Sequence, residues 1–167
     1  MNNDEGEVMN ELKRIMAAVD LSDYSPSVME YAGTLCKKIG AELVIVNVIN
    51  QRELDAIKTV QVFAQCKILE EDVIKRQKAE RTDKINMLVD RYHLKEVPSK
   101  IVFRVGIPFE QLIQAAGDEN VQMVVMGPKG RGNVPGVRFG SSAEKMFRHC
   151  PVPLLSVRGS LHGEESD

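Results

Sequence analysis

A glycine-rich segment with three cationic side chains is the part of the sequence best suited to chemistry. It spans residues 127–142, follows the apolar run 121–126 and precedes a helix-like stretch at 143–149. Glycines let a backbone approach a ligand closely, and the N–H groups and dipole of a helix start favour anions. The segment contains no acid, and its cations are Lys129, Arg131 and Arg138. We therefore predict an anion-binding loop that suits a nucleotide.

The segment matches neither of the two common phosphate motifs. Gly127 and Gly132 have the separation of a P-loop, but residues 133–134 are Asn-Val where that motif has Lys and Ser or Thr. Gly130 and Gly132 match the start of a dinucleotide fingerprint, but the next glycine, Gly136, comes one residue late. The spacing that stands out is instead Gly-x2-Gly-x9-Gly-Ser, beginning at Gly127.

Apolar segments that are typical of strands alternate with helical patterns along the chain. We expect strands at 15–19, 41–49, 99–105, 121–126 and 153–157. This alternation predicts a parallel sheet with right-handed crossovers and helices on both faces, a three-layer α/β sandwich. Ligands of such sheets bind beyond the carboxyl ends of the strands, where the strand order reverses. If the first and fourth strands are neighbours, Asp20 and Gly127 face one crevice.

Two helical regions connect the early strands. Ser22 or Ser25 is expected to cap the first helix, with Pro26 in its first turn and Gly40 at its end. Its predicted apolar face consists of Val28, Tyr31, Ala32, Leu35 and Ile39. In the charged stretch 50–94, the spacing of Ile85, Leu88, Val89 and Tyr92 predicts a long amphipathic helix whose charges form an exposed face. Residues 51–67 are left open between helix and loop.

The bulk composition describes one ordinary globular domain. The chain has 167 residues and a net charge of −2, which argues against a general nucleic-acid or membrane surface. Its three cysteines form no CxxC pair, and no apolar run approaches the roughly 20 residues of a membrane span. We expect a cytoplasmic protein with a disordered lead at 1–11, a domain at 12–158 and a flexible tail at 159–167. No metal-ligand cluster is visible.

Several segments together resemble the universal stress protein family. The glycine spacing follows a strand that ends in Val-Met, as in that family's nucleotide signature. Four further segments agree: Ile-Met-Ala-Ala-Val-Asp at 15–20, Val-Asn-Val-Ile at 46–49, Val-Gly-Ile-Pro at 105–108 and Pro-Val-Pro-Leu-Leu-Ser-Val at 151–157. The resemblance covers about residues 12–158. It implies a Rossmann-like fold, related to the adenine nucleotide alpha hydrolases, with five strands in the order 3-2-1-4-5.

Because the signature glycines are present, the chain resembles the branch of this family that binds ATP. The resemblance implies that Asp20 and its neighbourhood meet the adenosine, that Val48 meets adenine, and that the glycine loop holds the phosphates. The implied nucleotide-binding residues are Ala18, Asp20, Val48, Met126, Gly127, Lys129, Gly130, Arg131, Gly140, Ser141 and Ser142. A divalent ion, Mg²⁺ or Mn²⁺, would bind through the phosphates with few protein ligands.

The sequence departs from the family pattern at a few positions. Pro128 lacks an N–H donor, Asn47 stands where a histidine is common, and residues 135–136 are Pro-Gly in the middle of the loop. These departures concern affinity rather than the existence of a site. Simpler roles also stay open: Asp20 could cap the following helix, and Lys129 and Arg138 could be solvated surface charges.

Three functions fit these features. The first is an ATP-binding regulatory protein with slow or no hydrolysis, because the loop supplies cations but no base to activate water. The second is a nucleotide-independent interaction module, which the family resemblance implies to be a homodimer joined through the last strands. Val152–Val157 is apolar and lies at an expected sheet edge, which would favour aggregation if left bare. The third is a slow ATPase or adenylate-transferring enzyme, for which Asp20 is the only nearby candidate base.

Overall fold

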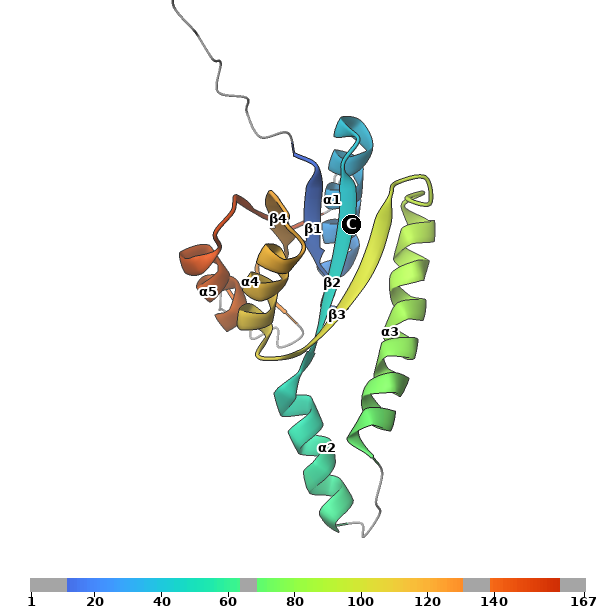
Figure 1. Cartoon of the computed structure of the whole chain (residues 1–167), viewed down its shortest axis with the longest axis vertical. Coiled ribbons are helices and arrows are strands. Elements are labelled where there is room, and N and C mark those ends of the chain that lie inside the picture. The colour runs from blue at the N-terminus through green and yellow to red at the C-terminus, as the bar shows by residue number, and fades with distance from the viewer. Residues whose placement is uncertain (1–11, 64–68, 131–138, 160–167) are drawn as a thin grey trace, which may run out of the picture.

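The computed structural model describes residues 12–63, 69–130 and 139–159 and shows a five-stranded parallel sheet (Figure 1). The strand order is β3-β2-β1-β4-β5, so the predicted order is confirmed. The strands are β1 (Arg14–Ala18), β2 (Glu42–Asn50), β3 (Ser99–Gly106), β4 (Met123–Met126) and β5 (Leu154–Ser156). The predicted strands are therefore all present, and only the fourth and fifth are shorter than expected.

Helices cover both faces of the sheet. They are α1 (Ser25–Ile39), α2 (Gln51–Phe63), α3 (Glu70–Arg91), α4 (Pro108–Asp118) and α5 (Ser141–His149). Ile15 and Ala17 of β1 pack in the same buried cluster as residues of α1 and α3, whereas Met16 packs with residues of α4 and α5. Successive side chains of β1 thus enter opposite layers, which explains why a strand buried on both faces is apolar throughout.

The strand order reverses at β1. In register, Ala18 lies opposite Val46 of β2 on one side and opposite Met126 of β4 on the other. The chain extends from β1 through β2 to β3, then returns across the sheet to β4 and β5. The carboxyl ends of β1 and β4 are therefore neighbours, and the crevice expected at this reversal lies between them.

The start of α1 differs from its predicted capping. Neither Ser22 nor Ser25 is the cap: Tyr24 occupies that position in a near-helical conformation, and no side chain bonds the first turn. Pro26 lies in the first turn as predicted. The hydroxyl of Ser25 instead donates to the Asp20 carboxylate, so a group that could cap the helix is used at the end of β1.

The buried face of α1 is also shifted from the prediction. Met29 and Cys36 are fully buried, whereas Ile39 is 48% exposed. Gly40 ends the helix in the left-handed region, with φ of 72°, as its position predicts. Val28 and Ala32 of the predicted face are buried and Tyr31 and Leu35 are partly buried, so the buried face keeps most of the predicted residues and extends to Met29 and Cys36.

The segment left open at 51–67 begins as a helix. α2 extends away from the sheet beyond the carboxyl end of β2, whereas α3 returns from there and runs back alongside β3 (Figure 1). Leu54 is the buried anchor of α2, and an ion pair of 2.7 Å between Lys58 Nζ and Glu70 Oε2 joins the two helices. The predictions for residues 64–67, for the lead at 1–11 and for the tail beyond 159 concern positions outside the described residues.

Within the described ranges, each helix is too short or too polar to cross a bilayer.

Candidate functional site

A pocket of about 340 Å³ lies where the strand order reverses. It is bounded by the carboxyl ends of β1, β2 and β4 and by the starts of α4 and α5. The predicted nucleotide-binding residues that the structure describes all line it: Ala18, Asp20, Val48, Met126, Gly127, Lys129, Gly130, Gly140, Ser141 and Ser142. Arg131, also predicted, and Arg138 lie outside the described residues. Residues far apart in the sequence thus converge on one cavity of a size that suits a small ligand.

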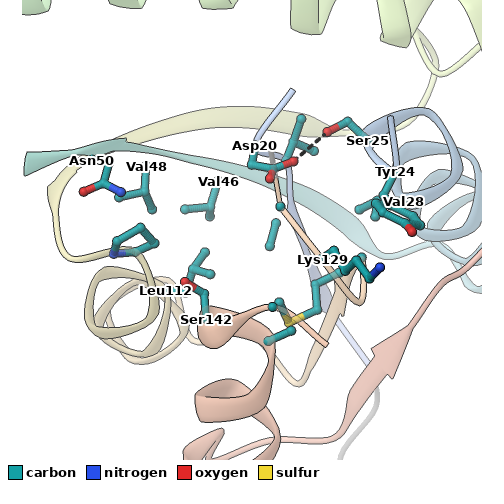
Figure 2. Close-up of a pocket in the computed structure, with 18 of the residues that line it drawn as sticks. Asp20, Tyr24, Ser25, Val28, Val46, Val48, Asn50, Leu112, Lys129 and Ser142 are labelled. Atoms are coloured by element: carbon teal, nitrogen blue, oxygen red, sulfur yellow. Dashed lines mark hydrogen bonds between the residues drawn. The ribbon is translucent and has the colours of Figure 1, made fainter. Parts of the chain in front are cut away.

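One end of the pocket is mostly apolar. Val46 and Val48 follow each other along β2, Leu112 of α4 lies across from them, and Asn50 closes the row (Figure 2). Pro108, in the first turn of α4, also lines the cavity. Facing aliphatic side chains with a few polar groups at the rim provide a slot for a flat ring, such as a nucleobase.

Asp20 lies between the apolar end and the glycine segment. Its Oδ1 atom accepts hydrogen bonds from the Ser22 amide at 3.0 Å and from the Ser25 hydroxyl at 3.2 Å (Figure 2). Leu21 connects these residues with φ of 63°, a conformation that leucine rarely adopts. Asp20 therefore stabilises a tight turn after β1 and does not cap α1, which has no side-chain cap.

The glycines after β4 permit two close approaches. A Cβ at Gly130 would lie 2.8 Å from Asp20 Oδ2, and a Cβ at Gly127 would lie 2.7 Å from the Cβ of Tyr24. Both distances are too short for any other residue without movement. Gly130 thus lets the loop contact the carboxylate at the end of β1, whereas Gly127 lets the same loop pack on the start of α1.

The two ends of the glycine segment are joined at the start of α5. The Gly140 amide donates to the Pro128 carbonyl at 2.9 Å, so the residue that lacks an N–H serves as an acceptor. Gly140 is the N-cap of α5 in an extended conformation, and no side chain bonds the first turn. Ser141 and Ser142 begin the helix beside the pocket. Uncapped amides at a helix start favour a phosphate or another anion.

The charged residues that line the pocket are spread along it and do not gather at one point. Lys129 extends toward the α1 side, at the other end from Asn50 (Figure 2). Two acidic residues, Asp20 and Glu53, also line the cavity. No cluster of three or more His, Cys, Asp or Glu side chains occurs among the described residues.

The sequence interpretation missed two charged residues near the apolar end. Glu53 lines the pocket from the first turn of α2, and Arg81 of α3 lies behind it with only 7% of its surface exposed. Glu53 falls in the segment left open, and Arg81 falls in the helix interpreted as an exposed face. A signal for Arg81 was available, since it precedes Ile85 by four residues and so belongs to the buried stripe of α3.

The chain is similar in sequence to known universal stress proteins. Relatives include a universal stress protein of Thermus aquaticus, 29% identical over 87% of this chain and 98% of its own length. Another, from Methanocaldococcus jannaschii, is 23% identical over 87% of this chain and 94% of its own length.

Solved structures share the fold at low identity. UspA from Lactobacillus plantarum has a TM-score of 0.71 at 17% identity, covering 89% of this chain and 99% of its own. A universal stress protein in complex with cAMP has a TM-score of 0.63 at 17% identity, covering 89% of this chain and 98% of its own. A universal stress protein from Archaeoglobus fulgidus in complex with dAMP has a TM-score of 0.58 at 16% identity, covering 88% of this chain and 98% of its own. The model of the universal stress protein family matches residues 11–158, which include the sheet and the whole pocket, and the chain therefore belongs to this family.

Proposed function

We propose that this protein binds ATP in the pocket at the strand reversal and acts as a nucleotide-dependent regulatory protein. The observation that carries the proposal is the pocket itself, in which an apolar slot, the Asp20 carboxylate and the uncapped start of α5 line one cavity (Figure 2). A base fits the slot, and a phosphate chain fits the glycine segment and the first-turn amides. Two structural neighbours are complexes with the adenine nucleotides cAMP and dAMP, which supports adenine as the base.

The proposal includes a divalent cation, Mg²⁺ or Mn²⁺, held by the phosphates. The described residues offer no carboxylate cluster for such an ion, and Mg²⁺ commonly binds through substrate phosphates and water. Ser141 and Ser142 begin α5 and line the pocket beside the proposed phosphate position. The ion would neutralise phosphate charge there.

Hydrolysis is expected to be slow or absent. Phosphoryl transfer to water needs a group that orients or deprotonates the water. Of the described carboxylates that line the pocket, Asp20 accepts from Ser22 and Ser25, and Glu53 accepts from Arg81. Asp20 thus holds the turn after β1 and Glu53 forms an ion pair, and the proposal gives neither carboxylate the role of activating water. The expectation would be contradicted if the wild-type chain hydrolysed ATP and the Asp20→Ala variant still bound ATP but no longer hydrolysed it. That result would favour the slow ATPase.

The test of ATP binding uses the full chain. Purified protein is denatured and its supernatant is chromatographed for adenine nucleotides, and the stripped protein is then titrated with Mg-ATP. ATP at 100 times its Kd should stabilise the fold by about 2.7 kcal/mol and raise the Tm by roughly 5–10 °C. Absence of both co-purified nucleotide and a Tm shift would favour the nucleotide-independent module.

We further propose a homodimer through Val152–Val157. β5 is the edge of the sheet and pairs with β4 along one side. Arg158 lies over the ring of Phe139, which makes an edge-to-face contact with Phe147, and both rings are exposed beside this edge. An edge strand with exposed aromatic rings suits pairing across a two-fold axis. Light scattering at micromolar concentration should give twice the chain mass, and a monomer would refute the dimer.

A further inference from the structure

A buried arginine from α3 lies directly behind the apolar end of the pocket. The NH1 nitrogen of Arg81 donates to Asn47 Oδ1 at 3.0 Å and to the Val48 carbonyl at 3.4 Å. Its NH2 nitrogen donates to Glu53 Oε2 at 2.9 Å and to Gln77 Oε1 at 3.1 Å. A buried guanidinium is tolerated only when such partners replace water, so its position is tightly defined.

Asn47 connects this arginine to the centre of the sheet. The side chain is fully buried, and its Nδ2 atom donates to the Val19 carbonyl at 2.6 Å. The Val19 amide donates in turn to the Val46 carbonyl at 2.9 Å. Arg81 and Asn47 together therefore fix the ends of β1 and β2, and β2 carries Val46 and Val48 of the slot.

Glu53 is the charged partner of Arg81 that lines the pocket. It lies in the first turn of α2 and lines the cavity together with Val48 and Asn50. Its ion pair with Arg81 selects one orientation of a side chain that is otherwise partly exposed. An ionised carboxylate only accepts hydrogen bonds, so at this end of the pocket it favours a ligand edge that donates.

We propose that Arg81 is a positioning residue and that the Glu53 carboxylate it holds accepts a hydrogen bond from the exocyclic amino group of the bound base. This inference rests on the proposed nucleotide function and adds its base specificity. Adenine carries an amino group at the ring position where hypoxanthine carries a carbonyl oxygen. The carboxylate accepts from the first and repels the second, so the pair selects amino-bearing purines.

The test compares three ligands by calorimetry: ATP, inosine triphosphate and inorganic tripolyphosphate, each with Mg²⁺. The wild-type chain should prefer ATP to inosine triphosphate by about tenfold or more. In Glu53→Gln this preference should fall to within about threefold, because an amide can also donate to a carbonyl. The affinity for tripolyphosphate, which has no base, should stay unchanged.

Variants of α3 separate positioning from a purely structural role. Arg81→Met should weaken ATP binding and remove the preference while leaving tripolyphosphate unaffected. Arg81→Lys should restore the preference only in part, because an ammonium can pair with Glu53 but lacks the fork that reaches Asn47 as well. Arg76→Met is the matched control: it removes an arginine of the same helix that is 83% exposed and paired with Glu80, and it should bind all ligands as wild type does.

The outcomes distinguish this inference from the proposed function. A wild-type chain that binds ATP, with the same preference in Glu53→Gln, would overturn the role of Glu53 and leave ATP binding intact. Equal losses of ATP and tripolyphosphate affinity in Arg81→Met would show that Arg81 acts on the fold alone. If Arg81→Met does not fold, Glu53→Gln decides, since that side chain is partly exposed. A wild-type chain that binds no nucleotide would overturn both.

Discussion

The carboxylate of Asp20 lies against the backbone of Gly130, so close that a Cβ on residue 130 would come within 2.8 Å of Oδ2. Asp20 begins the turn after β1, Gly130 belongs to the loop after β4, and these two strands are neighbours in the sheet. The pocket is therefore closed along one side by a contact that requires glycine. That contact also sets where the carboxylate stands relative to the glycine segment.

Substitution Gly130→Ala tests this contact. The added methyl would force the Asp20 carboxylate away from its bonds with Ser22 and Ser25. We expect ATP affinity to fall about tenfold or more, which corresponds to roughly 1.4 kcal/mol. Calorimetric titration measures the Kd, and urea unfolding measures stability.

The control for this substitution is Gly117→Ala in α4. No atom lies within 4 Å of a Cβ at that position, so ATP affinity should be unchanged and stability should rise by about 0.5–1 kcal/mol. Wild-type affinity in Gly130→Ala would show that the contact with Asp20 does not matter for binding.

A second prediction concerns Gly127, whose backbone packs against the side chain of Tyr24 at the start of α1. Gly127→Ala should destabilise the fold by about 1–3 kcal/mol, because the new Cβ would lie 2.7 Å from that of Tyr24. Tyr24→Gly removes the Cβ of residue 24, with which the new methyl group of Gly127→Ala would collide. In a double-mutant cycle followed by urea unfolding, the two substitutions should couple by about 1 kcal/mol or more. Additive effects would mean that the loop relaxes elsewhere.

The parts of the site that sequence could predict share one property: each depends on a local pattern. Strands buried on both faces are recognisable because β1 and β2 are almost continuously apolar. The alternation of strands and helices then brings Asp20 and Gly127 together at the reversal of strand order. The glycine spacing predicts that Gly127, Gly130 and Gly140 line the pocket without any knowledge of tertiary contacts.

The parts that could not be predicted depend on partners distant in the sequence. Arg81 is one charge among many in α3, and its burial follows from acceptors on β2 and α2 that only the fold brings near. Glu53 has a defined role only once Arg81 is placed. The predicted cap of α1 was wrong for the same reason. The Ser25 hydroxyl donates to Asp20, which lies before the helix, and does not bond the first turn.

A third prediction concerns the buried amide of Asn47. Asn47→Leu removes the acceptor of Arg81 NH1 and the donor to the Val19 carbonyl. Each group left unsatisfied costs about 1–3 kcal/mol, so urea unfolding should show a loss of roughly 2–5 kcal/mol. The double variant Asn47→Leu/Arg81→Met should recover part of this loss, because no buried charge is then left without its partner. A double variant as unstable as the sum of both single changes would argue against their direct coupling.

The last prediction concerns the thiol of Cys36 in the core under α1. Burial raises the pKa of Cys36 from 9.0 to about 11, because the charged thiolate is disfavoured away from water. Below pH 9 the thiol is protonated in both the folded and unfolded chains, and it contributes no pH dependence. Between pH 9 and 11 the unfolded chain loses this proton first, so stability falls as pH rises, by up to roughly 2–3 kcal/mol.

Comparison with Cys36→Ala isolates this effect from the titration of lysine and tyrosine side chains. Alanine leaves a small cavity, whose cost is an offset that does not change with pH. Urea unfolding in the presence of a reductant at pH 8, 9, 10 and 11 should therefore show a steeper decline in the wild type than in the variant. Parallel declines would mean that water reaches the thiol in the folded protein, and hence that the packing of α1 on β1 is looser at Cys36 than its burial indicates.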